Sequence, residues 1–267
     1  MGKRTKLHYI ASGRNQMPAV LFLHGFMGSG DDWTGIIDGL EGNYCSLVVD
    51  LPGHGASTKG EDDAWYTIEG TARALCDLLD ERGIERCALV GYSMGGRVAL
   101  YFALHYPERC SKLMLESASP GLATREEREV RRREDEKRAH YLEQGNLEAF
   151  LNDWYRQSLF ASLTLHDGLV ERMIASRCRN DRRELARSLR GMGTGSQPSL
   201  WEGLSTLPVS TLVVAGALDA KYVAIARRME RLGAQIRAAV VPDAGHNVHV
   251  EVPAVYLDRV HTFLKQR

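Results

Sequence analysis

The sequence predicts an α/β protein whose mostly parallel, doubly wound sheet is divided by a helical insertion. Short apolar runs of strand length alternate with segments of helical length in the first 122 residues, and the alternation resumes after residue 207. Between these parts the chain is charged and amphipathic and has no convincing strand. We therefore expect a core made of residues 1–122 and 208–267, covered by a helical lid that residues 123–207 form.

Short, mainly apolar runs predict the strands, because a parallel strand is buried on both faces. Such runs span residues 19–23, 46–50, 87–90, 112–115, 209–215 and 235–241. Helical length and periodicity mark residues 67–82, 94–106 and 250–265. Strands that alternate with helices form βαβ units, so the strands are expected to run parallel.

The overall charge excludes a general attraction to polyanions. Of the 267 residues, 34 are lysine or arginine and 34 are aspartate or glutamate, which gives a formal net charge of zero. The whole protein therefore has no field that would draw in nucleic acid or an anionic membrane. No apolar run approaches the roughly 20 residues that span a bilayer. We expect no nucleic-acid and no membrane partner, and a monomer or a weak homo-oligomer.

The cysteines and the first residues bear on location and metal content. The five cysteines are scattered, none is part of a C-x-x-C pair, and no histidine lies at zinc-ligand spacing. We expect a reduced interior with no metal and no cofactor. The first 13 residues are basic, but no apolar segment of signal-peptide length follows them, and Lys6 stands where N-myristoylation requires serine or threonine. A cytoplasmic location is the resulting prediction.

The sharpest chemical motif is Gly91-Tyr92-Ser93-Met94-Gly95, a G-x-S-x-G pattern between a predicted strand and a predicted helix. A serine on such a tight turn adopts a strained backbone conformation, and only glycine at the flanking positions avoids a Cβ clash between strand and helix. The hydroxyl then projects at the carboxyl ends of the strands, beside a helix amino terminus. These features indicate a nucleophile or base at Ser93.

A serine needs a histidine to take its proton and a carboxylate to orient that histidine. Asp219 follows the run at 209–215, and His246 follows the run at 235–241, so both groups lie at strand carboxyl ends. The order Ser93, Asp219, His246 is the one that this serine motif requires. His246 is favoured over His249 as the base. Because we expect His246 at the edge of the site, we expect its removal to cost less than about 1 kcal/mol of stability.

The same chemistry requires backbone NH groups aimed at developing oxyanion charge. His24-Gly25-Phe26-Met27-Gly28 directly follows the first predicted strand, where such a loop belongs. The NH groups of Phe26 and Met94 are the predicted donors. We interpret His24 and His54 as side chains that brace loops rather than take part in chemistry.

Together these motifs resemble the α/β-hydrolase superfamily over nearly the whole chain, and the α/β-hydrolase fold is the expected fold. Four segments narrow the resemblance to the MenH family: Gly91-Tyr92-Ser93-Met94-Gly95-Gly96-Arg97, LESASPGL at 115–122, Trp154-Tyr155 with LFASL at 159–163, and GHNVH at 245–249. Members of that family are 2-succinyl-6-hydroxy-2,4-cyclohexadiene-1-carboxylate synthases of menaquinone biosynthesis.

The resemblance implies a lyase rather than a hydrolase. The expected reaction eliminates pyruvate from 2-succinyl-5-enolpyruvyl-6-hydroxy-3-cyclohexene-1-carboxylate after the triad removes a proton from carbon. Two other readings remain open at this point. One is a serine hydrolase that acts on an ester or a carbon–carbon bond, and the other is a ligand receptor that kept the fold and lost turnover. A receptor of this kind often lacks a triad member, whereas this chain has all three.

Independent physics points to an anionic substrate at Arg97. Ser93 and Arg97 are four residues apart, so they lie about 40 degrees apart on one face of the predicted helix. A cation in a first helical turn opposes the helix dipole by about 0.3 to 1 kcal/mol, which favours a compensating anion. That anion is either a substrate carboxylate or a core acid such as Glu116, and we favour the substrate, a small polycarboxylate.

The family resemblance further implies substrate-binding residues in the lid and beside the serine. The implied carboxylate-binding arginines are Arg131 and Arg177. The implied pocket-lining aromatic residues are Tyr92, Trp154, Tyr155 and Phe160. Arg131 lies in a densely charged segment at 126–137, where Arg128 and Arg132 are its alternatives and where i, i+4 ion pairs on a solvated helix are equally expected.

Overall fold

The computed structural model describes residues 7–40, 42–57 and 62–266. Lys6 and the rest of the 1–6 segment, on which the prediction from the amino terminus partly depends, lie outside these residues. One seven-stranded sheet runs through the described chain, in the order β1-β3-β2-β4-β5-β6-β7. Its strands are β1 (Tyr9–Ser12), β2 (Ala19–Leu23), β3 (Cys45–Val49), β4 (Cys87–Tyr92), β5 (Cys110–Glu116), β6 (Thr211–Gly216) and β7 (Ile236–Val241).

All neighbouring strands pair in parallel except β1, which pairs antiparallel with β3 at the sheet edge. The prediction of a mostly parallel α/β sheet is therefore confirmed. The run at 19–23 coincides with β2, and the other predicted strands differ from the observed ones by a few residues at their ends. The edge strand β1 was not predicted, because its partly exposed residues form no continuous apolar run.

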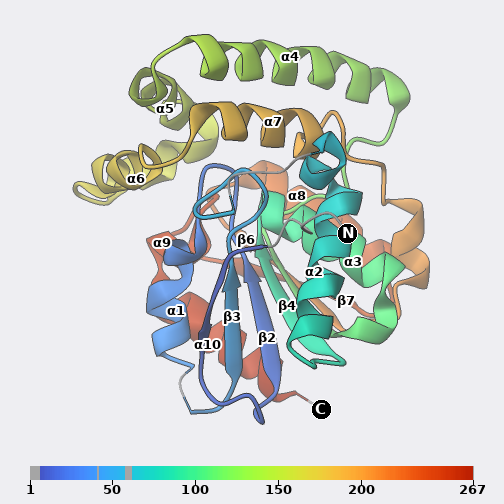
Figure 1. The fold of residues 1–267 in the computed structure, drawn as a ribbon. Helices are drawn as coiled ribbons and strands as arrows, with labels where there is room; N and C mark the ends of the chain where they lie inside the picture. Colours follow the sequence, from blue (N-terminus) through green and yellow to red (C-terminus); the bar gives the residue numbers. More distant parts are fainter. Residues whose placement is uncertain (1–6, 41, 58–61, 267) are drawn as a thin grey trace.

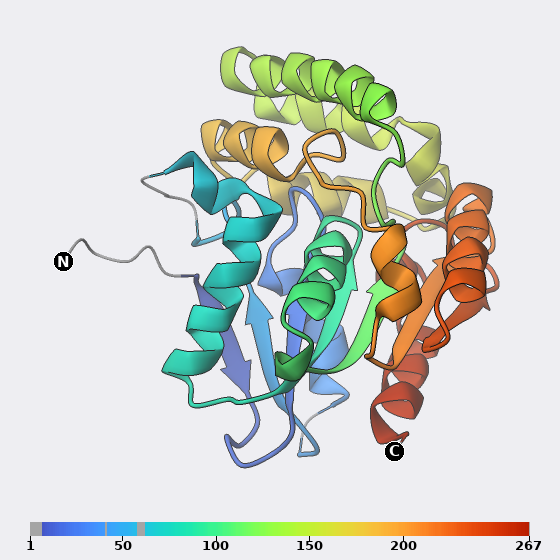
Figure 2. The ribbon, with the colours of Figure 1, turned by 90° about the vertical axis from the view of Figure 1, so that its right-hand side faces the viewer.

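Helices cover both faces of the sheet (Figures 1 and 2). The helices α2 (Ile68–Glu81), α3 (Met94–His105) and α8 (Ala220–Leu232) share one hydrophobic cluster with strand residues such as Leu21 and Leu89. Residues one position along those strands, such as Phe22 and Val90, point to the other face. There they pack with α1 (Thr34–Asp38) and α10 (Pro253–Lys265). This period-two alternation explains why a central strand such as β2 is apolar on both faces.

The predicted terminal helix at 250–265 is interrupted. The structure has a short α9 (Val248–Glu251) and then α10, with Val252 between them at φ −136° and ψ 64°. A proline disfavours helical conformation in the residue before it, and Pro253 instead begins α10. The 3₁₀ helices are η1 (Gly30–Trp33), η2 (Asp63–Tyr66), η3 (Pro107–Arg109), η4 (Ser158–Leu165) and η5 (Glu202–Thr206).

The segment between β5 and β6 is helical and lies over the carboxyl ends of the strands (Figures 1 and 2). It contains α4 (Arg125–Gln144), α5 (Leu147–Tyr155), α6 (Leu169–Arg177) and α7 (Arg182–Met192). These helices have a hydrophobic cluster of their own, which the core loop residue Met27 joins. We call this segment the lid. No helix in the described ranges is long and apolar enough to cross a membrane.

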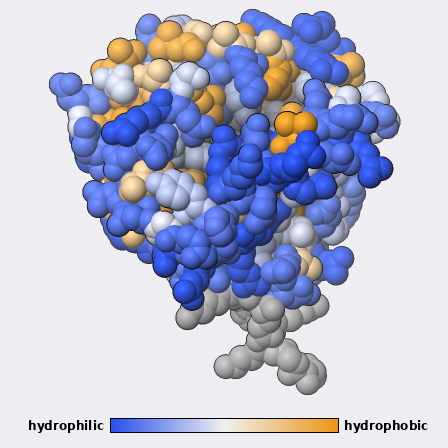
Figure 3. Space-filling model, turned by 90° about the horizontal axis from the view of Figure 1, so that it is seen from above, coloured by the Kyte–Doolittle hydropathy of each residue, from blue (hydrophilic) through white to orange (hydrophobic). Residues whose placement is uncertain are grey.

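The charged run of α4 is helical because its ends and its charges are satisfied. Thr124 and Glu127 form a reciprocal capping box at the start of the helix. Arg190 of α7 reaches across to Glu136 and Glu143 of α4. Hydrophilic side chains cover most of the molecule on this side (Figure 3).

Candidate active site

Ser93 lies on a strained turn between β4 and α3. Its backbone has φ 48° and ψ −106°, a conformation that non-glycine residues rarely adopt. A Cβ on Gly91 would lie 2.6 Å from the Gly95 carbonyl oxygen, and a Cβ on Gly95 would lie 2.3 Å from the Leu23 carbonyl oxygen. The close approach of β2, β4 and α3 therefore requires both glycines of the motif.

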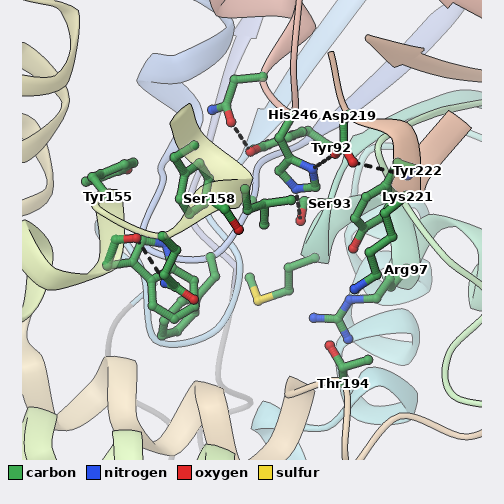
Figure 4. Close-up of a pocket in the computed structure, with 18 of the residues that line it drawn as sticks. Tyr92, Ser93, Arg97, Tyr155, Ser158, Thr194, Asp219, Lys221, Tyr222 and His246 are labelled. Carbon is green, nitrogen blue, oxygen red and sulfur yellow. Dashed lines mark hydrogen bonds and ion pairs between the residues drawn. The ribbon is translucent and has the colours of Figure 1, made fainter. Parts of the chain in front are cut away.

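Three distant segments place the serine, the histidine and the aspartate in contact. The Nε2 atom of His246 lies 3.2 Å from Ser93 Oγ, and its Nδ1 atom lies 2.8 Å from Asp219 Oδ2. Figure 4 shows the imidazole between the hydroxyl and the carboxylate. Each group follows a different strand, namely β4, β6 or β7, and these strands end at one edge of the sheet.

The expectation that His246 lies at the edge of the site is wrong. Its side chain is only 2% exposed, and the rings of Tyr92, Phe160 and Tyr222 surround it at centroid distances of 5.5, 5.9 and 4.6 Å. The lid supplies Phe160 and α8 supplies Tyr222, and sequence position alone did not reveal this coverage. Removal of the imidazole would therefore leave a cavity and cost more than the 1 kcal/mol expected above.

Two backbone NH groups remain free next to Ser93. Neither the Phe26 NH nor the Met94 NH donates a hydrogen bond to any group in the described part of the chain. Met94 is the first residue of α3, so its NH also carries the partial positive charge of the helix amino terminus. The Gly95 NH, in contrast, donates to the His24 carbonyl oxygen at 3.0 Å and joins the two loops.

His24 and His54 brace loops, as the sequence analysis interpreted them. His24 Nδ1 donates to the Gly25 carbonyl oxygen at 2.7 Å, and its Nε2 accepts from the Leu51 NH at 3.0 Å. His54 Nδ1 lies 3.0 Å from the Pro52 carbonyl oxygen. Burial lowers the pKa of both imidazoles below its ordinary value, which favours their neutral forms.

Every side chain or NH group predicted for the site lines one cavity of about 380 Å³. This size suits a small organic molecule. Aromatic residues of the lid and cations from α3, α4, α6 and α8 line the cavity. Within the described residues, no three histidine, cysteine, aspartate or glutamate side chains come together in a way that would hold a metal ion.

Arg97 is a buried cation without a carboxylate partner among the described residues. Its residue is 8% exposed, and its Nη1 donates to the Gln197 amide oxygen at 3.0 Å. Burial lowers the pKa of its guanidinium to about 10, which leaves it charged at neutral pH. Glu116, the core acid considered as its partner, instead binds His249. No carboxylate in the described part of the chain therefore compensates the charge of Arg97.

The two lid arginines already have acid partners. Arg177 lies 2.8 Å from both carboxylate oxygens of Asp32, and its Nε lies 3.3 Å from the Tyr155 hydroxyl. Burial lowers the pKa of the Arg177 guanidinium, but the Asp32 carboxylate and the Tyr155 hydroxyl outweigh it and together raise that pKa above its ordinary value. Arg131 pairs with the buried Asp135 at 2.7 Å. Both line the cavity, so their predicted contact with substrate stays a prediction, but each reaches it as part of an ion pair.

The alternatives to Arg131 do not line the cavity. Arg132 donates to the Gly195 carbonyl oxygen at 3.3 Å, and Arg128 donates to the carbonyl oxygens of Leu122 and Ala123. The register chosen from the family resemblance is thus the one that turns an arginine of α4 toward Ser93.

Several cavity residues were not predicted. Lys221 and Tyr222 follow Asp219 in α8, and the Tyr222 NH donates to the Asp219 carboxylate at 3.1 Å, so the carboxylate caps the helix. Their position directly after the acid could have suggested them. Arg138 lies 5.9 Å from the Trp154 ring centroid and 3.6 Å from Asp135. No local motif distinguishes it from its charged neighbours.

Comparison with known proteins places this geometry in a family. The family model described as the alpha/beta hydrolase fold matches residues 18–253. A Bacillus subtilis protein is 39% identical and covers 94% of this chain. The 2-succinyl-6-hydroxy-2,4-cyclohexadiene-1-carboxylate synthase of Pectobacterium atrosepticum is 36% identical over 92% of this chain and 94% of its own. The structure of MenH from S. aureus superimposes with a TM-score of 0.91 at 34% identity, covering 97% of this chain and 98% of that one.

The chain belongs to the MenH family of the α/β-hydrolase superfamily. The fold and family expected from the sequence are therefore confirmed. An enol-lactonase from Burkholderia xenovorans superimposes with a TM-score of 0.83 at 20% identity, which shows the shared fold alone. The MenH relatives favour a synthase over the general serine hydrolase that the sequence motifs left open.

Proposed function

We propose that this protein is a carbon–oxygen lyase of menaquinone biosynthesis, a 2-succinyl-6-hydroxy-2,4-cyclohexadiene-1-carboxylate synthase that releases pyruvate. The relatives carry the name of this activity. The observation in this chain that carries the proposal is Arg97, a buried cation without an acid partner in the described chain, lining the same cavity as Ser93. A substrate with several carboxylates would supply the missing anion.

The substrate and product define the bond changes. The substrate, 2-succinyl-5-enolpyruvyl-6-hydroxy-3-cyclohexene-1-carboxylate, has one ring double bond, at carbon 3, whereas the product has two, at carbons 2 and 4. A proton must leave carbon 2, which the adjacent ketone acidifies. The electron pair of that bond forms the 2,3 double bond, the 3,4 pair moves to carbons 4 and 5, and the bond from carbon 5 to oxygen breaks. The enolate of pyruvate departs and takes up a proton.

The triad is suited to the proton transfer. As Ser93 Oγ takes the proton from carbon 2, it would give its own hydroxyl proton to His246 Nε2, which lies 3.2 Å away. Asp219 fixes the tautomer of His246 by accepting from Nδ1 at 2.8 Å and stabilises the imidazolium that forms.

The free NH groups suit the charge that develops on the substrate. As carbon 2 loses its proton, negative charge moves onto the ketone oxygen. The NH groups of Phe26 and Met94 are free to donate to that oxygen, and one such donor typically contributes about 10²- to 10³-fold in rate. Because neither group has to break a bond within the described chain to do so, the stabilisation needs little reorganisation.

The cations suit the carboxylates. Arg97 is the strongest candidate for a direct charge-assisted contact, because its charge is buried and uncompensated. Lys221 lines the same cavity and lies near Arg97 in Figure 4. Arg131 and Arg177 would present guanidinium groups that Asp135 and Asp32 hold in place. The aromatic wall around Trp154 would cover the ring and exclude water from the enolate.

The test is release of pyruvate from authentic substrate by the purified protein, followed through lactate dehydrogenase and NADH. We expect Ser93→Ala to lower kcat by at least about 10³-fold. Neutral aryl esters serve as the competing substrates. Absence of pyruvate above the spontaneous rate would overturn the proposal, as would rapid ester hydrolysis that Arg97→Met leaves unchanged.

A further inference from the structure

Glu116 connects the turn that carries Ser93 with the loop that carries His246. It is the last residue of β5, and its carbonyl oxygen accepts the Ser93 NH at 2.8 Å. Its carboxylate accepts the His249 NH at 3.1 Å and lies 2.9 Å from His249 Nδ1 through both oxygens. His249 follows His246 by three residues, so a single residue contacts both Ser93 and the segment that carries His246.

This connection is fully buried. The side chains of Glu116 and His249 are 0% and 1% exposed. The His249 ring stacks on Trp33 at a centroid distance of 4.5 Å and contacts Tyr92, the neighbour of Ser93, at 4.9 Å. A buried ionisable pair is often no more stable than an apolar pair of the same volume. Stability alone therefore does not account for two ionisable groups at this place.

The remaining contacts of the histidine loop do not replace this connection. The Glu251 carboxylate accepts the NH groups of Gly245 and Asn247, on either side of His246, but Glu251 belongs to the same segment and shapes it only locally. The Tyr92 hydroxyl donates to the Asn247 side chain and is a second link to β4. Glu116 is the residue that joins the histidine segment to the strand on which the Ser93 NH rests.

We propose that Glu116 and His249 form a positioning pair that holds the Ser93 hydroxyl and the His246 imidazole within reach of each other. The proposal rests on the roles given to Ser93 and His246 under the proposed function. The contact between those two groups is 3.2 Å long, so a shift of either segment breaks it. A misplacement of about 1 Å can cost about 10²-fold in rate. Because Tyr92 provides a second link, loss of the pair should lower the reactivity of Ser93 without abolishing it.

The test measures Ser93 itself and does not depend on the substrate. A fluorophosphonate forms a covalent bond to serine oxygen and releases fluoride, and the rate of this labelling reports how well His246 activates Ser93. The probe is applied to the wild-type protein and to Glu116→Gln, with Ser93→Ala as the blank. We expect Glu116→Gln to lower the labelling rate by about tenfold to hundredfold.

A matched control separates positioning from general destabilisation. Phe263→Leu removes packing on the same face of the sheet, in α10, without touching the Glu116–His249 pair. If Phe263→Leu loses as much thermal stability as Glu116→Gln, it should still label at the wild-type rate. Glu116→Asp retains the negative charge but shortens the side chain by one methylene. It therefore tests the same contact with His249 if Glu116→Gln fails to fold. We expect slower labelling in this variant as well.

The outcomes decide between the proposals. Wild-type labelling rates in the folded Glu116 variants, or an equal loss in Phe263→Leu, would overturn the positioning role. A wild-type protein that does not label would remove the activated serine on which the proposed function also depends. Normal labelling of the wild type without pyruvate release would contradict the proposed function and leave the positioning pair intact.

Discussion

The sheet and the lid supply the same cavity by different physical means. The sheet holds Ser93, Asp219 and His246 at the ends of β4, β6 and β7, and the ladder hydrogen bonds between strands fix how far apart these ends lie. The lid brings Arg131 and Arg177 from helices, and each is held by a carboxylate. The strand ends thus position the triad, whereas ion pairs between side chains position the lid arginines. Substitutions in the sheet should mainly lower kcat, and those in the lid should mainly raise KM.

The largest effect is expected from Asp219→Asn. An amide cannot hold His246 in the tautomer that leaves Nε2 free to accept a proton, so kcat for pyruvate release should fall by about 10⁴-fold. Asparagine also caps helices well, and Asp219 caps α8 through the Tyr222 NH, so stability should change by less than about 1 kcal/mol. Pyruvate kinetics and thermal denaturation measure both. A variant that keeps a tenth of wild-type kcat would show that the sheet does not supply the chemistry.

Arg97→Met should change activity and stability in opposite directions. Loss of the cation removes a charge-assisted contact in a buried site, which should lower kcat/KM by about 10²- to 10³-fold. The free protein no longer buries an uncompensated charge, so its free energy of unfolding should rise by about 1 kcal/mol. Substrate titration measures the fall in kcat/KM, and chemical denaturation measures the rise in the free energy of unfolding. As a control, Arg227→Met removes an exposed cation of α8 and should alter neither quantity.

Loss of stability together with activity in Arg97→Met would mean that Arg97 supports the fold. That result would contradict an anion site at this position, because a structural role requires a partner inside the chain.

The contrast between sheet and lid also sets what could be predicted from sequence. Ser93, Asp219 and His246 each lie within five residues of the end of a recognisable apolar run, so local pattern located them. Contacts between residues that lie far apart in the sequence could not be predicted from local pattern. Asp32 lies 145 residues before Arg177, and His249 lies 133 residues after Glu116, so no periodicity links either pair. The burial of His246 depends on Phe160 and Tyr222, which other elements supply.

Breaking the pair between lid and core should have an intermediate effect. Asp32→Asn leaves Arg177 buried without its anion, which should cost about 3 kcal/mol of stability and raise KM by about tenfold as the arginine turns from its place. Asp31→Asn is the matched control, because the Asp31 carboxylate, next to Asp32 in the sequence, is exposed and forms no ion pair with any described residue. Chemical denaturation and pyruvate kinetics compare the two. Equal effects in both variants would contradict a specific role for the Arg177–Asp32 pair.

The smallest effects should separate three neighbouring arginines of α4. Arg131→Ala removes the one of the three that lines the cavity and should raise KM by about tenfold. Arg128→Ala and Arg132→Ala remove only hydrogen bonds to backbone carbonyl oxygens, so KM should stay within about twofold of wild type. Steady-state kinetics on the three variants measure this order. If Arg132→Ala raised KM as much as Arg131→Ala, the lid would act through its total charge, and the position of one side chain would not matter. Raising the salt concentration tests that point, since a contact inside the cavity is screened less than a diffuse surface field.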